Sequence, residues 1–166
     1  IELSNLCAKN CFYCGIRRGN ASVSRYTLSE AEVLDAAAFA HGAGYGSLVL
    51  QGGERQDGEF IARVERMVRL IKEASNNELG ITLSLGEQAE ESYRRWFAAG
   101  AHRYLLRIET SNPSLYRSLH PEDHDFDSRI EALRALGRLG YQVGTGVMIG
   151  LPGQTTEDLA GDIGFF

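Results

Sequence analysis

The stretch Cys7-Ala8-Lys9-Asn10-Cys11-Phe12-Tyr13-Cys14 contains every cysteine of this chain of 166 residues. The spacing C-x3-C-x2-C puts three thiols on one short loop, close enough to bind a single metal centre. Three ligands are one fewer than a closed tetrahedral zinc site or a fully ligated iron–sulfur cluster requires. In a 4Fe–4S cube, three irons would then carry a protein ligand, and the fourth iron would stay open to a small molecule.

Two other uses of the cysteines stay open. A structural zinc site would need a fourth ligand from elsewhere in the chain. A disulfide fits less well, because the number of cysteines is odd and their spacing suits a metal. The four histidines do not stand at a metal-ligand spacing from the loop, so we assign no role to His41, His102, His120 and His124.

Short β-rich runs alternate with longer runs of helical periodicity along the whole chain. The expected strands are 1–5, 47–51, 81–85, 103–109 and 141–149. The expected helices are 29–43, 58–74, 87–98, 113–119, 128–139 and one that opens at Thr155. This alternation predicts an α/β fold with a parallel sheet and right-handed crossovers. An eight-fold barrel needs about 250 residues, so a partial barrel of roughly five βα units fits; on pattern alone, a doubly wound open sheet fits equally well.

Polar groups follow the second and third expected strands, at the edge where parallel barrels place their working groups. The second strand runs into Gln51-Gly52-Gly53-Glu54, where paired glycines let backbone approach a ligand or simply form a turn. In the third strand, Thr82 and Ser84 share one face, which we expect to point into the barrel. Hydroxyls there need a polar ligand, water or a neighbouring strand.

Charged side chains mark the fourth strand and the helix after it. Arg107 and Glu109 share a face with Leu105, and burying them is costly unless they pair with each other or with a charged ligand. Arg129 falls in the first turn of a helix, where the macrodipole disfavours a cation. An anionic ligand would relieve that conflict, and a solvated surface arginine is the alternative.

The fifth expected strand is unusually rich in glycine. Glycines at 144, 146 and 150 would allow a flat ligand to approach the backbone closely. Met148 lies in the middle of this segment, where it could contact such a ligand or act as ordinary core filler.

The cysteine loop resembles that of the radical S-adenosylmethionine (SAM) enzymes, which reads C-x3-C-x-aromatic-C with Tyr13 in the aromatic place. The resemblance implies a 4Fe–4S cluster held by Cys7, Cys11 and Cys14, with SAM bound at the open iron. It implies reductive cleavage of SAM to a 5′-deoxyadenosyl radical, in which the protein supplies binding, orientation and exclusion of side reactions. It also favours the partial barrel over the open sheet, since these enzymes are complete or partial barrels.

The resemblance extends to the polar strand ends. It implies that Gly52, Gly53 and Glu54 bind the amino group of SAM, that Glu109 suits the ribose hydroxyls, and that Met148 centres an adenine-binding G-x-apolar-x-G element. The remaining cofactor-binding candidates are Thr82, Ser84 and Arg129. Arg107 and Arg103 are our candidates for an anionic substrate.

Four longer strings resemble one branch of the family, the maturases of di-iron hydrogenase of the HydE type. They are residues 10–18, 82–87, 106–113 and 150–155. This resemblance implies an iron–carbonyl–cyanide–cysteine precursor as substrate, an electron donor such as reduced ferredoxin or flavodoxin, and other hydrogenase maturation proteins as partners. Biotin synthase and methylornithine synthase share the cluster loop and are the more distant alternatives.

Composition sets the remaining expectations. With 43% hydrophobic residues the chain can build one domain with its own core. A net charge of -5 argues against a nucleic-acid-binding surface. The chain has no apolar run long enough for a membrane span, and we expect a cytoplasmic protein. Because it opens inside a strand pattern and stops inside a helix pattern, we expect residues 1–166 to be a radical SAM core domain cut at both ends.

Overall fold

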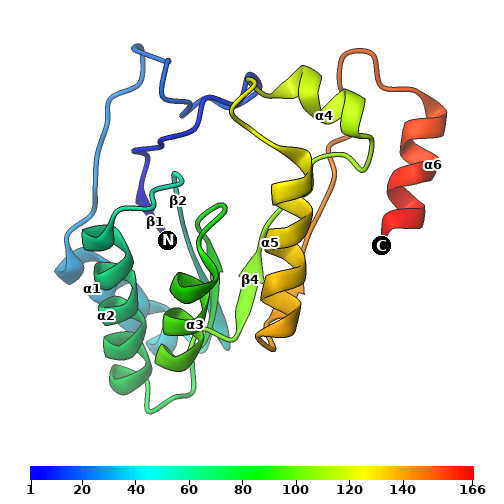
Figure 1. Cartoon of the computed structure of the whole chain (residues 1–166). Coiled ribbons are helices and arrows are strands. Elements are labelled where there is room, and N and C mark those ends of the chain that lie inside the picture. Colours follow the sequence, from blue (N-terminus) through cyan, green and yellow to red (C-terminus); the bar gives the residue numbers. More distant parts are fainter.

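The computed structural model describes all of residues 1–166, and it contains one parallel sheet (Figure 1). The five strands are β1 (Glu2–Ser4), β2 (Ser47–Gly52), β3 (Gly80–Ser84), β4 (Arg103–Leu105) and β5 (Gln142–Gly144). Every neighbouring pair is parallel and the spatial order is β1-β2-β3-β4-β5. A doubly wound sheet reverses its strand order at a switch point. The sequential order therefore identifies a partial (β/α) barrel and removes the open-sheet alternative.

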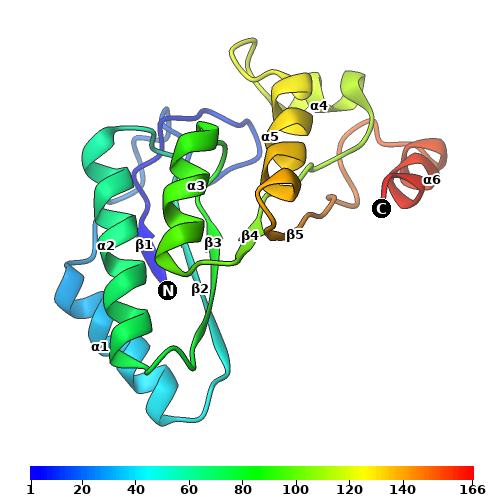
Figure 2. The same cartoon turned by 60° about the horizontal axis from the view of Figure 1, so that its bottom comes forward.

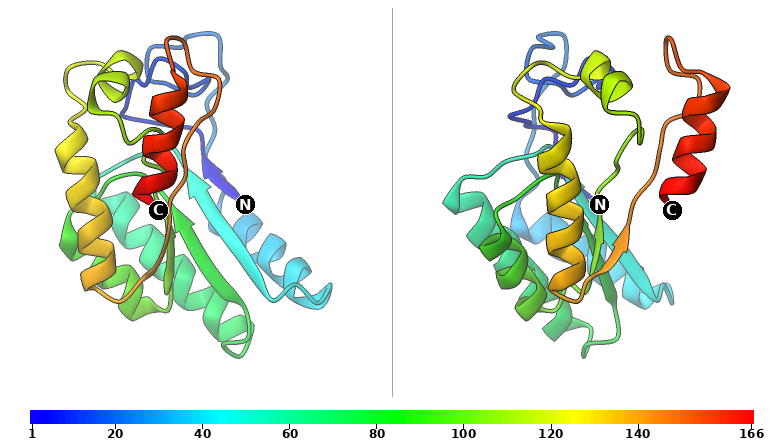
Figure 3. Two further views of the ribbon diagram at one scale, coloured as in Figure 1. Left: turned by 90° about the vertical axis from the view of Figure 1, so that its right-hand side faces the viewer. Right: turned by 45° about the vertical axis from the view of Figure 1, so that its right-hand side comes forward.

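Helices separate the strands, and four of the six cover one face of the sheet (Figure 2). The six helices are α1 (Glu30–Gly42), α2 (Gly58–Ala74), α3 (Glu90–Ala99), α4 (Pro113–Leu119), α5 (Phe126–Arg138) and α6 (Thr156–Phe165). Figure 2 shows α1, α2 and α3 side by side against the strands, with α5 beyond α3. In Figure 3 the opposite face of the sheet carries no such layer. None of these helices is long and apolar enough to cross a membrane.

Local sequence sets the helix ends. Ser29 caps α1 and forms a capping box with Glu32, and α2 spans the residues that its apolar spacing predicts. The expected start of α5 at residue 128 was wrong. Asp125 caps α5, because its carboxylate accepts the N–H of Ser128 and lets the helix begin at Phe126.

An aromatic cluster fills the space between the sheet and the helices. Tyr93 and Trp96 of α3 are fully buried against Tyr104 of β4, and the ring centroids of Tyr93 and Tyr104 are 5.0 Å apart. The indole N–H of Trp96 donates to the Ile61 carbonyl at 3.0 Å, so no polar atom of this side chain is left unpaired. The face of the fourth strand that meets the helices is therefore apolar.

The last two strands are shorter than expected, at three residues each. Beyond β5 the hydroxyl of Thr145 accepts the N–H of Ile108 at 3.0 Å, which replaces a ladder bond. Pairing returns only as an isolated bridge between Glu109 and Val147. Glu109 has φ of 68°, in the left-handed region that residues other than glycine rarely adopt. Regular strand geometry thus ends where the polar residues of the mouth begin.

Helix α6 stands apart from the covered face (Figures 1 and 2). Polar contacts hold it to the segment after β4. The buried carboxylate of Asp162 accepts the N–H of Ser111 at 2.6 Å and its hydroxyl at 2.7 Å. Asn112 donates its side-chain N–H to Asp158. Ile163 on the same helix stays 77% exposed, so this attachment involves little apolar burial.

Candidate active site

The three cysteines lie on the loop that follows β1, at the end of the sheet where α4 also lies (Figure 1). All three thiols are free and half-buried. They are close neighbours, since charge on Cys7 or Cys14 acts on the thiol of Cys11. Burial raises the pKa of Cys11 to about 11, so a bound metal would be needed to keep it a thiolate at neutral pH.

The arrangement of these ligands bears on the kind of metal centre. No group of three or more His, Cys, Asp or Glu side chains is gathered closely enough to chelate a single metal ion. The thiolates around a cube bind separate irons, so they stand farther apart than the ligands of one ion. Three free thiols on one loop are the ligand set that a cube with one open iron needs.

The end of β2 supports the cluster loop, by which we mean residues 7–14. A methyl group at Gly53 would overlap the carbonyl of Leu6 and lie within 2.8 Å of Cys7 Cα. The N–H of Ala8 donates to the carbonyl of Glu54 at 2.8 Å. The glycine that we expected to serve a ligand thus also makes room for the backbone that carries the thiols.

Glu54 is already engaged within the chain. Its carboxylate lies 3.4 Å from the ammonium of Lys9 and accepts the N–H of Glu87 at 2.9 Å. Burial raises the pKa of Glu54, and the charge of Lys9 opposes that effect. Gly86, with φ of 74°, has no room for a side chain because this carboxylate lies against it. Glu54 therefore ties the cluster loop to the end of β3 as well as bordering the pocket.

A polar pocket of about 220 Å³ lies beside the cluster loop at the carboxyl ends of the strands. It gathers most of the side chains and glycines that the sequence selected. They are Cys7, Cys14, Gly52, Gly53, Glu54, Ser84, Arg107, Glu109 and Arg129. Residues from the loops after four different strands thus meet at one place, as the barrel topology requires.

Glu109 is a buried carboxylate at the pocket with only one of its two oxygens paired. The side chain is 4% exposed, and one carboxylate oxygen accepts the hydroxyl of Tyr13 at 3.1 Å and lies 3.6 Å from the guanidinium of Arg107. The other oxygen is buried without any hydrogen-bond partner. Leaving a buried carboxylate oxygen unpaired is costly. An acceptor held open in this way fits a ligand with hydroxyl donors, such as the ribose of SAM.

Arg129 borders the same pocket, but an internal partner balances its charge. Its Nε donates to Glu87 at 2.5 Å and its Nη1 to the carbonyl of Arg107 at 2.6 Å. Burial works against this cation, yet Glu87 outweighs it and the pKa of Arg129 is raised. The residue is 6% exposed, so the alternative of a solvated surface arginine is wrong. The macrodipole conflict is relieved by Glu87 rather than by an external anion.

Five candidates are not part of the pocket lining: two of them, Cys11 and Tyr13, belong to the cluster loop, and three lie on other elements. Arg103 starts β4, at the amino end of the strand, and bonds to Gln142 at 2.9 Å. Thr82 sits in the middle of β3, below Ser84 on the same half-buried face. Met148 is half-buried, and its N–H donates to the carbonyl of Glu109 at 2.8 Å. Of these last three, only Met148 is thus in direct contact with a pocket residue, whereas Tyr13 of the cluster loop also bonds to Glu109.

Sequence reasoning missed the buried histidine next to the pocket. His120 bonds through Nδ1 to the carbonyl of Tyr116 at 2.7 Å, and its Nε2 lies 3.4 Å from the hydroxyl of Tyr13. Burial lowers the pKa of His120 to about 4, so the ring is neutral at physiological pH. Its contact with Tyr13 joins residues 107 positions apart, and no local pattern could have revealed it.

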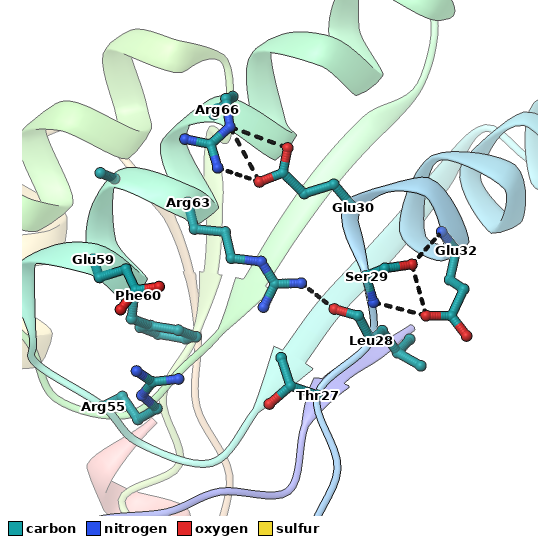
Figure 4. A pocket seen from close by; sticks show the side chains of 11 residues that line it. Thr27, Leu28, Ser29, Glu30, Glu32, Arg55, Glu59, Phe60, Arg63 and Arg66 are labelled. Atoms are coloured by element: carbon teal, nitrogen blue, oxygen red, sulfur yellow. Dashed lines mark hydrogen bonds and ion pairs between the residues drawn. The ribbon is translucent and has the colours of Figure 1, made fainter.

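A larger cavity, of about 630 Å³, lies outside this site between the starts of α1 and α2 (Figure 4). Its charged side chains largely satisfy one another. Arg66 pairs with Glu30, and Arg63 donates to the carbonyl of Leu28. The three arginines that line it face three glutamates, so it offers no net charge for a ligand. None of the residues selected from the sequence lines this cavity.

The fold and the pocket define a partial parallel barrel with three thiol ligands at its mouth. A model of the radical SAM superfamily matches residues 1–166. The chain belongs to the radical SAM superfamily. Membership implies a 4Fe–4S cluster and SAM, and the three thiols and the open acceptor on Glu109 fit that pair.

Three relatives place the chain within the superfamily. It is 46% identical to the [FeFe] hydrogenase maturase subunit HydE of Thermotoga maritima, over 99% of this chain and 46% of that protein. Biotin synthase of Pelodictyon phaeoclathratiforme is 30% identical over 93% of this chain and 47% of that protein. The crystal structure of methylornithine synthase (PylB) superposes with a TM-score of 0.89 at 27% identity, covering 99% of this chain and 48% of that one.

The order of these similarities confirms the resemblance that the sequence strings carry, with the HydE type nearer than biotin synthase or methylornithine synthase. The chain spans about half the length of the curated relatives it matches.

Proposed function

We propose that this chain is the core-domain part of a radical SAM enzyme that matures di-iron hydrogenase. The observation that carries the proposal is the 46% identity to a HydE maturase across 99% of the chain. The proposed substrate is a small iron–carbonyl–cyanide–cysteine precursor, attacked at sulfur. The proposed partners are a low-potential electron donor, such as ferredoxin or flavodoxin, and the other hydrogenase maturation proteins.

The proposed roles follow from the pocket. Cys7, Cys11 and Cys14 would hold the cluster and leave one iron open for SAM. When bound, the cluster and SAM supply one-electron reductive cleavage that yields a 5′-deoxyadenosyl radical. Glu109 would orient the ribose through its unpaired oxygen. Arg107, with its side chain 63% exposed at the pocket, is free to bind the anionic precursor.

The remaining cofactor contacts are proposed from the backbone and hydroxyls that border the same pocket. Gly52, Gly53 and Glu54 would accept hydrogen bonds from the ammonium of SAM, and Ser84 would face it from β3. Met148 would lie against the adenine, next to the strand bridge that positions Glu109.

Anaerobic reconstitution of the full-length protein tests this function. A brown protein whose cluster spectrum changes on addition of SAM is the expected result, and an adenosylated sulfur product should form with a synthetic iron–carbonyl–cyanide–cysteine complex. SAM cleavage without that product would point to a biotin synthase-like or methylornithine synthase-like reaction. Bound zinc with no response to SAM would reject the enzyme proposal altogether.

Replacing one thiol sharpens this test. Cys11→Ser should abolish 5′-deoxyadenosine formation, because one cluster ligand is lost. Ser22→Ala, on the same connection and exposed, should leave it unchanged. Product formation by Cys11→Ser at the wild-type rate would refute the ligand assignment.

A further inference from the structure

We propose that Arg25 is the positioning residue of the cluster loop, because its guanidinium bonds to the backbone on both sides of the loop. The proposal rests on the proposed function of the three cysteines as cluster ligands. Neither the metal motif nor the pocket lining includes Arg25.

The guanidinium of Arg25 bonds to four backbone carbonyls. Arg25 donates through Nη1 to the carbonyls of Asn5 at 2.6 Å and Ile16 at 2.8 Å. Through Nη2 it donates to the carbonyls of Arg17 at 2.7 Å and Asn20 at 3.2 Å. Asn5 lies two residues before the first cysteine and Ile16 two residues after the last. One side chain therefore ties the chain entering the cluster loop to the chain leaving it.

Arg25 is itself held in place by Asn5. The side chain of Asn5 donates to the carbonyl of Ser24 at 2.7 Å and accepts the N–H of Tyr26 at 2.8 Å. These are the two neighbours of Arg25 in the chain, so both the side chain and the backbone of Arg25 are fixed to the end of β1. A planar guanidinium with five donors can bond several carbonyls at once, whereas a lysine ammonium offers three donors on a single atom.

The charge of Arg25 has no internal counterion. It forms no ion pair, and every acceptor of its guanidinium is a neutral carbonyl. Residues 3–29 contain four basic side chains and no Asp or Glu, in a chain whose net charge is -5. The four bonds of Arg25 are therefore all made by a charged donor to backbone, and they do not depend on any acidic side chain.

The first test needs no metal. In the full-length apoprotein, the rate of thiol modification by a chromogenic reagent reports how firmly the cluster loop is held. Arg25→Lys and Arg25→Gln should react roughly tenfold faster than wild type, the change expected when one charge-assisted bond no longer restrains the loop. Arg18→Gln is the matched control, because Arg18 is exposed on the same connection and its side chain makes no hydrogen bond. Its rate should equal that of wild type.

Thermal melting of the apoproteins separates local from global effects. Faster thiol modification with an unchanged melting temperature supports the positioning role of Arg25. If the rate rises only in proportion to a general loss of stability, Arg25 has an ordinary structural role and the proposal is overturned.

The second test measures the loaded protein. Both Arg25 variants should bind less iron per chain than wild type. Equal thiol rates and iron contents in all variants would refute the proposal. A wild-type protein that loads no iron would instead refute the proposed function.

Discussion

The helix-covered face of the sheet and its loop end are stabilised in different ways. On the covered face, Trp96 and Tyr104 are fully buried among apolar neighbours, and their few polar atoms bond to backbone. At the loop end, Glu109 and Arg129 are nearly as buried but charged, and one oxygen of Glu109 is left without a partner. Apolar burial contributes to stability wherever it occurs, whereas buried charge is maintained where it serves a purpose. The two regions should therefore respond differently to substitution.

The largest effect is expected where the loop end depends on the absence of a side chain. Gly53→Ala should reduce cluster content to near zero, because a methyl group there overlaps the backbone of the cluster loop at Leu6 and Cys7. Iron per chain after anaerobic reconstitution measures it. Gly58→Ala is the control, since a methyl group there meets nothing within 4 Å. Normal iron content in Gly53→Ala would show that the loop can move aside.

The matching change on the covered face should lower stability instead. Trp96→Ala removes a fully buried indole and its bond to Ile61, and should reduce the free energy of unfolding by about 3–5 kcal/mol. Urea denaturation of the apoprotein measures this loss, with exposed Arg94→Ala as the control. A loss below about 1 kcal/mol would mean that the aromatic cluster can repack around the cavity.

A smaller and more selective effect is expected at the open acceptor. Glu109→Gln should weaken SAM binding by roughly tenfold, the cost of replacing a charge-assisted hydrogen bond by a neutral one. Iron content should stay normal, because Glu109 bonds to Tyr13 and pairs with Arg107 but contacts none of the thiols, and a glutamine oxygen can still accept the Tyr13 hydroxyl. Arg103→Gln, at the amino end of β4 and outside the pocket lining, should change neither quantity. An unchanged affinity of Glu109→Gln for SAM would show that Glu109 acts only as an ion-pair partner of Arg107.

The smallest effect concerns pH. The pKa of His120 is lowered by burial from 6.5 to about 4 in the folded chain, so the unfolded chain binds an extra proton between these values. The stability that neutral His120 contributes is complete above about pH 6.5 and is lost as the pH falls towards 4. Apoprotein stability measured across this range should fall less steeply in His120→Gln than in wild type. Identical slopes would show that the histidine titrates freely in the fold.

The covered face was largely predictable from the sequence, because the patterns that determine it are local. Helix α2 begins and ends where its apolar spacing predicts, and the alternation in β3 buries Leu83 while leaving Thr82 half-exposed. Both patterns act over a few residues, so a single sequence contains them. The choice between barrel and open sheet is not local, and the family resemblance supplied it before the strand order confirmed it.

The loop end was predictable only in part. The residues of the pocket could be selected from the sequence, because polar groups are conspicuous at the ends of strands. The side chains with which they pair could not be predicted. The pairs Lys9–Glu54 and Arg129–Glu87 join residues far apart in the sequence, and neither was expected. The position of Arg103 could have been found. A residue that begins a parallel strand lies at the end away from the loops that carry the site.

The supports of the cluster loop have a consequence for the order of biosynthesis. The thiols precede most of their supports in the chain: Glu54 holds Ala8, and the carbonyl of Leu119 accepts the N–H of Phe12 at 2.9 Å. A ribosome delivers the cysteines more than a hundred residues before the last of these anchors. In the nascent chain the three thiols are thus open to oxidants and to other metal ions before the cluster loop can fold. This order favours iron delivery after translation rather than during it.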